Sequence, residues 1–207
     1  MKKNKDLSVM LKEAGILFLI TLIAGLLLGV VNELTKEPIR EKQEQAIQEA
    51  CQAVLPSAAF FEEIDYTLDL ALQQELSGMG VKTGSIFKAA AADGALLGYV
   101  VEAVSTQGYG GNIGLYLGVT IDGTLNDISI LEISETPGLG MQAEDVLAPQ
   151  FHDKKASSFL YTKNGAAADN EIDAITSATI TTKAVVNAVN GGLKVAHTLI
   201  EGGGLHE

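Results

Sequence analysis

The sequence predicts an α+β fold, in which an antiparallel sheet carries packed helices and is preceded by one N-terminal transmembrane helix. Three observations support this prediction: an uncharged apolar stretch near the N-terminus, two Asp-Gly pairs that each separate apolar runs, and an amphipathic pattern close to the end of the chain. Strands joined by hairpins and followed by helices are typical of α+β domains. The 207 residues suffice for one such domain and an appendage.

The appendage is the apolar stretch from Ala14 to Asn32, which reads AGILFLITLIAGLLLGVVN and contains no charged residue. As a helix it would extend roughly 28 Å, close to the hydrocarbon thickness of a bilayer. A helix of a soluble core would show a polar stripe, and this stretch has none. Thr21, Gly25 and Gly29 share one face that would let another membrane helix pack closely, although glycine is common in membrane helices in any case. We therefore predict that residues 1–33 form a tail and a membrane span.

The charges around the span predict its orientation. A cleaved signal peptide also starts with positive charge, but this apolar stretch is long for one, and the following VVNELTKEP lacks a small-residue cleavage site. The lysine and arginine bias across the span is small, because basic residues lie on both sides. Short positive tails stay in the cytoplasm, and long domains cross regardless of charge. We therefore expect a single-pass protein of the cell (inner) membrane, in contact with lipid, with a cytoplasmic N-terminus and an extracytoplasmic domain. The basic residues of the tail are Lys2, Lys3, Lys5 and Lys12.

A stalk helix is predicted for residues 34–57. The sequence from Glu33 to Leu55 is rich in Glu, Gln, Lys and Ala, and Pro56 follows it. Its charged positions suit a solvated face better than a binding site. The remaining residues, 58–207, are expected to form the globular domain. The apolar positions that share one face of the stalk are Ile39, Ala46, Ile47, Ala50 and Val54.

The first half of the domain predicts two hairpins. Asp93-Gly94 and Asp122-Gly123 each stand between two apolar runs, and this pair of residues is the strongest short-range hairpin signal. We therefore expect antiparallel pairing of four strands. Their expected ranges are 85–91, 95–104, 113–121 and 125–133.

The second half of the domain predicts helices. A short helix is expected over 141–147 and is stopped by Pro149, and a strand-like piece follows at 173–176. A final helix is expected over 182–200, ended by the glycines at 202–204. The apolar face of this last helix consists of Val185, Val189, Leu193, Ala196 and Ile200.

Composition excludes several classes of function. A net charge of −12 argues against nucleic acid as a partner, because binding it requires a basic face. Cys51 is the only cysteine, so no internal disulfide is possible, and it is interpreted as a small buried hydrophobe rather than a reactive thiol. His152, His197 and His206 lie far apart and are interpreted as surface or capping residues, so no metal site is expected. The sequence contains neither a Gly-rich nucleotide loop nor a G-x-S-x-G elbow, and we expect no catalytic residues.

Two loops have compositions that suit a bound ligand. The loop Glu135-Thr136-Pro137-Gly138-Leu139-Gly140 follows a predicted strand directly. A turn needs only Pro-Gly, whereas a second glycine beside an apolar Leu139 suits a flat ligand that lies against the backbone. The stretch from Gln107 to Gly111 carries few side chains apart from the ring of Tyr109, and would form another wall.

The hydroxyl-rich stretch TSATITT, from Thr176 to Thr182, precedes the last predicted helix. One hydroxyl, of Thr181 or Thr182, is enough to cap that helix. The helix N-terminus also favours a phosphate, and Lys183 adds a positive charge nearby. Capping and phosphate binding are both compatible with this pattern.

These residues resemble a known modification motif. Thr176-Ser177-Ala178-Thr179, preceded by Asp173, resembles the flavinylation motif of the FMN-binding domain family, in which the last threonine carries FMN through a phosphodiester bond. Thr179 is the matching residue, and Ser177 stands where glycine is commoner. The loop of residues 135–140 matches the second motif of the family, which lies against the flavin. With Tyr109 and Lys183 added, the expected cofactor-binding residues are Thr176, Ser177, Ala178, Thr179, Thr181, Lys183, Glu135, Thr136, Gly138, Leu139, Gly140 and Tyr109.

A membrane anchor followed by one such domain resembles the G subunits of Rnf complexes, which are membrane-bound ferredoxin:NAD oxidoreductases that pump sodium ions or protons. The resemblance covers nearly the whole chain. It implies a flavoprotein that relays electrons and carries FMN bound covalently through the phosphate of the cofactor. The implied partners are the other membrane subunits of the Rnf complex and a Mg-dependent flavin transferase that uses FAD. A separate enzyme is expected because only Lys183 stands near Thr179 as a base, and a threonine hydroxyl is a poor nucleophile unaided.

Three other interpretations remain open. The equivalent FMN-carrying subunit of the sodium-pumping NADH:quinone oxidoreductase shares the motif, and neighbouring genes would distinguish the two complexes. A non-redox, anchored extracellular binding module would lack a yellow chromophore. A pilin-like structural protein also combines an apolar helix with a β-rich domain, but this sequence lacks the start that pilins show.

Overall fold

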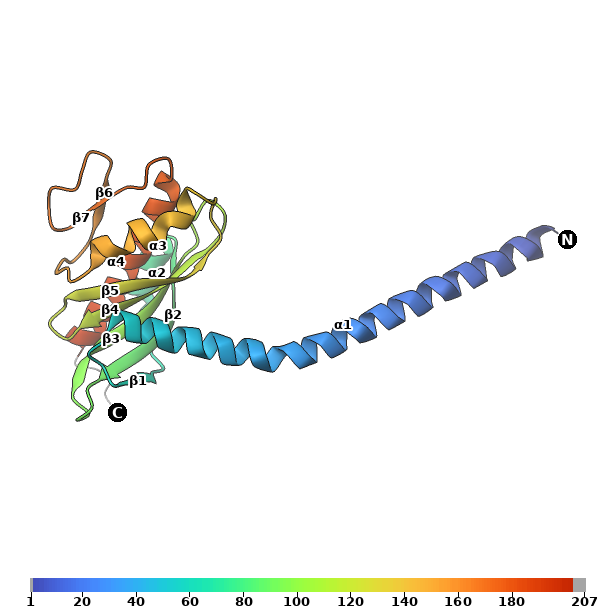
Figure 1. The fold of residues 1–207 in the computed structure, drawn as a ribbon, viewed down its shortest axis with the longest axis horizontal. Helices are drawn as coiled ribbons and strands as arrows, with labels where there is room; N and C mark the ends of the chain where they lie inside the picture. The colour runs from blue at the N-terminus through green and yellow to red at the C-terminus, as the bar shows by residue number, and fades with distance from the viewer. Residues whose placement is uncertain (1, 203–207) are drawn as a thin grey trace. The chain divides into compact units, whose positions relative to one another are not determined.

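The computed structural model describes residues 2–202, and the chain divides into two compact units, Met1–Ala46 and Ile47–Glu207. Helix α1 (Lys2–Val54), which passes from blue to cyan in Figure 1, makes up the first unit and ends in the second. Its part Met10–Val54 is long and apolar enough to cross a membrane, with a mean hydropathy of 2.7 in its most apolar region and none of that region buried. The structure therefore has one continuous helix, with Pro38 inside it, where a span and a separate stalk helix were expected.

The second unit is built around a five-stranded antiparallel sheet in the order β1-β2-β3-β4-β5 (Figure 1). Each strand pairs with its neighbour in sequence, so the sheet is a simple meander. Four of its strands match the four predicted ones to within four residues at each end, whereas the short edge strand β1 was not predicted. The strands are β1 (Phe60–Glu63), β2 (Val81–Ala90), β3 (Leu96–Ser105), β4 (Ile113–Thr120) and β5 (Leu125–Ile133).

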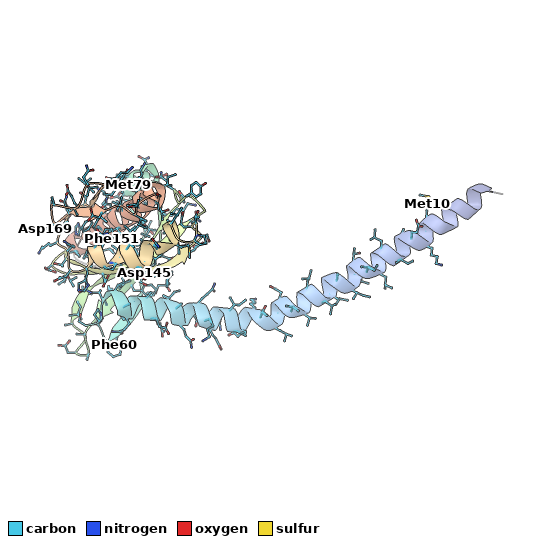
Figure 2. All side chains as sticks on the ribbon, turned by 45° about the horizontal axis from the view of Figure 1, so that its top comes forward. Met10, Phe60, Met79, Asp145, Phe151 and Asp169 are labelled. Carbon is cyan, nitrogen blue, oxygen red and sulfur yellow. The ribbon has the colours of Figure 1, made fainter. Side chains whose placement is uncertain are left out.

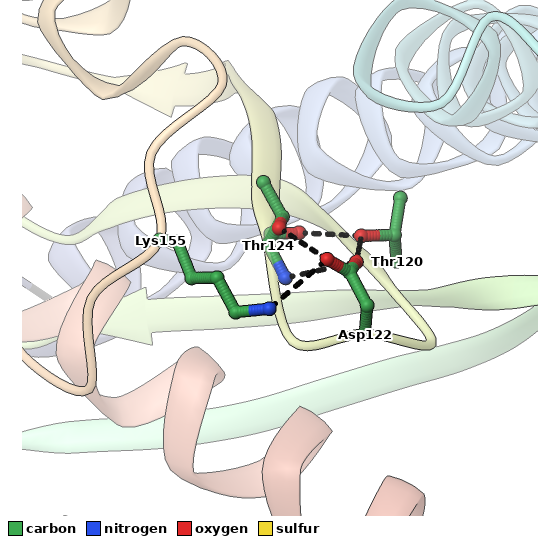
Figure 3. A network of polar contacts seen from close by, with 4 residues as sticks. All are labelled: Thr120, Asp122, Thr124 and Lys155. Atoms are coloured by element: carbon green, nitrogen blue, oxygen red, sulfur yellow. Dashed lines mark hydrogen bonds and ion pairs between the residues drawn. The ribbon is translucent and has the colours of Figure 1, made fainter.

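Both predicted Asp-Gly turns form, with Gly94 and Gly123 each at a φ of +84°. In the β4–β5 turn, the exposed carboxylate of Asp122 accepts hydrogen bonds from the hydroxyls of Thr120 and Thr124 and from the ammonium group of Lys155, whose Nζ lies 3.1 Å from Oδ2 (Figure 3). These contacts hold the pKa of Asp122 well below its usual range, and the hydrogen bond from the Thr120 hydroxyl contributes most. The turn residues thus close the hairpin and connect it to the segment that contains Lys155.

Helix α4 (Thr179–Glu201) packs on one face of the sheet, mainly against β3 and β4. Four of the five predicted apolar positions are buried and the fifth, Ile200, is half-buried against the same core. Gly192 lets the helix approach β4, because an added Cβ would lie 2.1 Å from Leu117 Cδ2. Phe151, labelled in Figure 2, belongs to the same core and packs edge-on against Phe159 at 5.1 Å between ring centroids. The helix begins three residues before its expected start, a shift that matters for the site. Gly203, Gly204 and His206 lie outside the described residues.

The last turns of α1, from Ile47 on, cover the sheet with a second, smaller apolar cluster. Cys51 is 1% exposed in this cluster, and burial raises its pKa to about 12, which confirms its interpretation as a buried hydrophobe. Gly118 of β4 faces this helix end, where an added Cβ would lie 2.4 Å from the carbonyl oxygen of Val54. Both broad faces of the sheet are therefore covered by helix.

The remaining elements are short. The helix expected over 141–147 is divided into a 3-10 turn and one α-helical turn, and Pro149 lies inside a further 3-10 turn that begins at Ala148. The strand piece expected at 173–176 ends at Asp173, because the chain then turns, with the Ala178 N–H bonded to the carbonyl of Ile175. These elements are α2 (Leu70–Gly78), η1 (Gly140–Gln142), α3 (Ala143–Val146), η2 (Ala148–Phe151) and the parallel pair β6 (Leu160–Thr162) and β7 (Glu171–Asp173).

Candidate functional site

A cavity of about 540 Å³ lies at the N-terminal end of α4. Its volume falls within the range of about 300–1,000 Å³ that is common for small-molecule sites. Three stretches that are distant in sequence meet here, and all three were selected from the sequence. The lining residues are Tyr109, Glu135, Thr136, Leu139, Gly140, Ser177, Ala178, Thr179, Ile180 and Thr181.

Glu135 holds these stretches together. Its side chain is 7% exposed. Oε1 accepts hydrogen bonds from the backbone N–H groups of Tyr109 at 2.8 Å and Gly110 at 3.3 Å, and Oε2 accepts one from Thr181 Oγ1 at 3.0 Å. One carboxyl group thereby connects the loop around Tyr109, the loop of residues 135–140 and the first turn of α4. The sequence indicated this residue only as part of a loop against a ligand, and nothing in its spacing revealed the three contacts.

The loop after β5 requires glycine at two positions, for two different physical reasons. Gly138 has a φ of +76°, a conformation that side chains rarely adopt. At Gly140 the reason is close packing, since an added Cβ would lie 2.6 Å from Thr181 Oγ1 and 2.7 Å from Glu135 Cβ. The second glycine of the motif is therefore required by the contact between this loop and α4, in addition to leaving the backbone bare toward the cavity.

The hydroxyl groups of Thr181 and Thr182 are used inside the fold. Thr181 donates to Glu135, as described, and Thr182 Oγ1 donates to the carbonyl of Ala178 at 3.0 Å and accepts from the N–H of Ile175 at 3.1 Å. Of the two alternatives that the sequence left open, capping of the helix by one of these hydroxyls is contradicted. Because α4 begins at Thr179, both residues lie within its first turn, and the helix has no side-chain cap.

The hydroxyls of Thr176, Ser177 and Thr179 differ from those two, because none has a hydrogen-bond partner among the residues that the structure describes. Thr176 is exposed outside the cavity, whereas Ser177 and the half-buried Thr179 line it. Ser177 also has a φ of +66°, in the left-handed region that glycine adopts without strain. Within the TSATITT stretch, the geometry thus leaves the hydroxyls of Ser177 and Thr179 available at the cavity, and Thr179 is the first residue of α4.

The cavity opening is apolar. Tyr109, Leu139 and Ile180 are 71%, 38% and 53% exposed, and all three line the cavity. Ile180 was not among the predicted site residues, because a helix starting at Thr182 would not have placed it at the cavity. Thr176, Gly138 and Lys183 were predicted to take part in cofactor binding but are not lining residues. Lys183 is exposed and falls in the second turn of α4, since the helix starts earlier than expected.

This arrangement fits an FMN group. An apolar opening suits an aromatic ring system, and the N-terminal turn of a long helix without a side-chain cap suits a phosphate. An unpaired hydroxyl stands at the same place. The site therefore has a suitable surface for each chemical part of the cofactor.

His152 and His197 lie apart from this cavity, and His206 lies outside the described residues. His152 Nδ1 lies 2.9 Å from Asp127 Oδ2 on an exposed surface, and His197 lies near Gly123 at the other end of α4. Within the described part of the chain, no group of three or more His, Cys, Asp or Glu residues is arranged to hold a metal ion.

Comparison with known proteins gives matches over both units. Residues 108–194 match the family model of the FMN-binding domain, and residues 1–54 match that of the RnfG N-terminal region. The chain is 34% identical over 206 residues to the G subunit of the Na⁺-translocating ferredoxin:NAD⁺ oxidoreductase complex of Acetobacterium woodii, with 96% of this chain and 97% of that one covered. It is 32% identical over 203 residues to the G subunit of the proton-translocating ferredoxin:NAD⁺ oxidoreductase complex of Clostridium ljungdahlii, with 98% and 100% covered.

A solved structure is also similar. The crystal structure of the C subunit of Na⁺-translocating NADH-quinone reductase from Parabacteroides distasonis matches with a TM-score of 0.50 and 20% identity, covering 69% of this chain and 78% of that one. At this identity the likeness concerns the fold, and it confirms the predicted α+β class.

Proposed function

Because this chain belongs to the family of Rnf complex G subunits, we propose that it is the electron-transfer flavin subunit of an ion-translocating ferredoxin:NAD⁺ oxidoreductase, with FMN joined through a phosphodiester bond to Thr179. One observation carries the choice of residue. The Thr179 hydroxyl lies at the cavity and has no partner in the described part of the chain, whereas the hydroxyls of Thr181 and Thr182 are engaged within the fold. The Ser177 hydroxyl is free there as well, and Thr179 is preferred to it because it matches the last threonine of the flavinylation motif.

The bound FMN supplies the redox chemistry, and the protein supplies its position and surroundings. Thr179 Oγ1 anchors the phosphate at the N-terminus of α4, where the helix dipole and the N–H groups of the first turn stabilise negative charge. Tyr109, Leu139 and Ile180 offer apolar and aromatic surface to the ring. The chain then acts as a relay between other membrane subunits of the complex, so no group for substrate chemistry is required.

Attachment requires a separate flavin transferase. The Thr179 oxygen attacks the FMN phosphorus of FAD, the pyrophosphate P–O bond breaks, AMP leaves, and the hydroxyl proton passes to a base of the transferase. Among the described residues that line the cavity, Glu135 is the one carboxylate, and its oxygens already accept three hydrogen bonds. The protein thus offers an accessible hydroxyl beside the small residues Ser177 and Ala178 and leaves its activation to the enzyme.

The membrane helix explains why a covalent bond to the cofactor is useful. The chain is a single-pass membrane protein by its one long apolar helix and its membrane-complex relatives. We place the N-terminus in the cytoplasm and the flavin domain outside it. A tethered cofactor keeps a high effective concentration at its site, whereas a free one would diffuse away from an extracytoplasmic domain.

The similarity favours the Rnf complex over the sodium-pumping NADH:quinone oxidoreductase. The G subunits of Acetobacterium woodii and Clostridium ljungdahlii match nearly the whole chain at more than 30% identity, whereas the match to the NADH-quinone reductase structure is a likeness of fold.

Substitution of the individual hydroxyls tests the anchor. The full chain is co-expressed with a flavin transferase as wild type and as Thr179→Ala, Ser177→Ala and Thr176→Ala. We expect Thr179→Ala to lose both the fluorescent band on a denaturing gel and the mass excess of one FMN less water, because its ester oxygen is gone. The other two variants should retain both signals. Retention of the mass excess by Thr179→Ala, or its loss in Ser177→Ala alone, would assign the anchor elsewhere.

A further inference from the structure

We propose that the carboxylate of Glu135 lowers the reduction potential of the flavin in this cavity through its negative charge. This inference rests on the proposed function, since it requires FMN to occupy the cavity. It gives Glu135 a second role besides connecting the three stretches, and it makes that residue a determinant of how strongly the protein donates electrons.

The hydrogen bonds of Glu135 require it to act as an acceptor. Two of its three partners are the backbone N–H groups of Tyr109 and Gly110, which can only donate, and both point to the same oxygen. The hydroxyl of Thr181 donates to the other oxygen. A carboxyl group that accepts at both oxygens is in the arrangement of an ionised one. The side chain is also almost fully buried, so water screens its charge weakly.

The charge is not balanced by a neighbouring cation. Among the described residues that line the cavity, Glu135 alone is charged. None of the ion pairs formed within the described part of the chain includes it, and Lys183 lies exposed outside the lining. A ring in the cavity therefore lies beside a buried negative charge that hydrogen bonds stabilise but no cation neutralises.

The direction of the effect follows from the charge balance of reduction. Two electrons and one proton convert the neutral ring into a reduced form that carries one negative charge, whereas two electrons and two protons leave it neutral. A fixed negative charge raises the free energy of the anionic form, and it does so more strongly in a low-dielectric site than in water. The flavin is consequently harder to reduce wherever proton uptake is incomplete, and its potential is lower.

Replacement by glutamine separates the charge from the hydrogen bonds. In Glu135→Gln, the amide oxygen still accepts from the N–H groups of Tyr109 and Gly110, and the Thr181 hydroxyl can rotate to accept from the amide nitrogen. Amide hydrogen exchange of the unloaded variant should therefore show native protection at Tyr109 and Gly110. Glu132→Gln is the matched control, because Glu132 lies exposed on β5 and is not part of the cavity lining.

The measurement is a redox titration of the full chain loaded with FMN, with dithionite as reductant and dyes as mediators, at alkaline pH. We expect Glu135→Gln to shift the midpoint potential upward and Glu132→Gln to leave it unchanged. Thr181→Val should shift it downward, because removing the hydroxyl donor leaves the charge on Oε2 less compensated. An upward shift of the midpoint potential in Glu135→Gln, together with a downward shift in Thr181→Val, supports the proposal.

An unchanged potential in loaded Glu135→Gln, or shifts of the same sign in both variants, would overturn it. Should Glu135→Gln fail to load with flavin, Thr181→Val decides alone, and a potential equal to that of the wild type refutes the inference. A wild-type chain that carries no FMN contradicts the proposed function instead, so the two failures are distinguishable.

Discussion

The hydroxyl groups at the start of α4 show how one residue type serves two purposes within a few positions. Thr181 and Thr182 face the protein and use their hydroxyls to connect the helix to Glu135 and to the backbone before it. Thr179 faces the cavity and has no partner among the described residues. The helical period separates Thr181 from Thr179, because residues two positions apart point to different sides of a helix, whereas Thr182 is engaged because its hydroxyl bonds back to the carbonyl of Ala178. Buried hydroxyls must be paired, whereas one at a cavity remains available for modification.

The backbone of Ser177 predicts a stabilising substitution. A residue other than glycine at a φ of +66° costs of the order of 1 kcal/mol, and glycine removes most of this strain at the cost of a more flexible unfolded chain. We expect Ser177→Gly to raise the free energy of unfolding by up to about 1 kcal/mol, measured by denaturant titration. The exposed neighbour Thr176 gives the control, because Thr176→Gly should be neutral or destabilising. A less stable Ser177→Gly protein would show that the strain is compensated elsewhere.

At the scale of elements, the β4–β5 hairpin is held by its turn residues as well as by its strands. Asp122 accepts from two threonine hydroxyls on either side of the turn, and its ion pair with Lys155 connects the hairpin to the segment after η2 (Figure 3). The backbone of Lys154 also pairs with Leu125, at the first residue of β5. The hairpin and this segment therefore support each other, which a hairpin signal in the sequence does not indicate.

The pH dependence of this hairpin follows from the lowered pKa of Asp122. A carboxyl group whose pKa is lower in the folded state stabilises the fold at every pH above its unfolded pKa of about 4, and this stabilisation declines as the pH falls toward the folded value. We expect Asp122→Asn to lower the melting temperature slightly at neutral pH, because the site is exposed and screened. The difference from the wild type should shrink below about pH 4. A difference that stays constant on acidification would mean that the charge of Asp122 is not involved.

At the scale of the whole molecule, the chain combines an apolar helix with a domain that has its own core. The two apolar clusters on the faces of the sheet consist of residues from the second unit, Ile47–Glu207. The first unit presents large apolar side chains that are exposed in the described structure, as expected of a helix that contacts lipid. The second unit therefore forms the apolar core of the domain, and the first unit provides the apolar surface for the membrane.

Removal of residues 1–46 tests this division. We expect the truncated chain to leave the membrane fraction and to unfold in one cooperative transition, because no residue of either apolar cluster is deleted. Membrane fractionation followed by thermal denaturation measures both properties. The control is a full-length variant in which the order of the apolar residues in the span is shuffled while their composition is kept. This variant should stay membrane-bound. Aggregation of the truncated chain in all conditions would show that the domain depends on its anchor.

Much of the architecture was predictable from the sequence because the signals are local. The Asp-Gly pairs, the uncharged stretch and the apolar face of the last helix each depend on neighbouring residues, and they led to the correct hairpins, first and last helices and fold class, whereas α2 was missed. Element boundaries were less reliable. The start of α4 was expected at residue 182, although the helix begins at Thr179, because the β-branched threonines there are equally compatible with an extended chain.

The sequence by itself determined the chemistry that this protein can carry: a hydroxyl motif, a glycine-containing loop and a membrane anchor, all of which are readable as short patterns. Tertiary structure alone decided how these parts meet. It made Glu135 the link between three stretches, made Gly140 necessary through its contact with Thr181, and separated the engaged hydroxyls from the available ones. The physical reason is that hydrogen-bond pairing and close approach depend on distances across the fold. A pattern along the chain specifies which groups exist, and only packing specifies which of them remain unpaired.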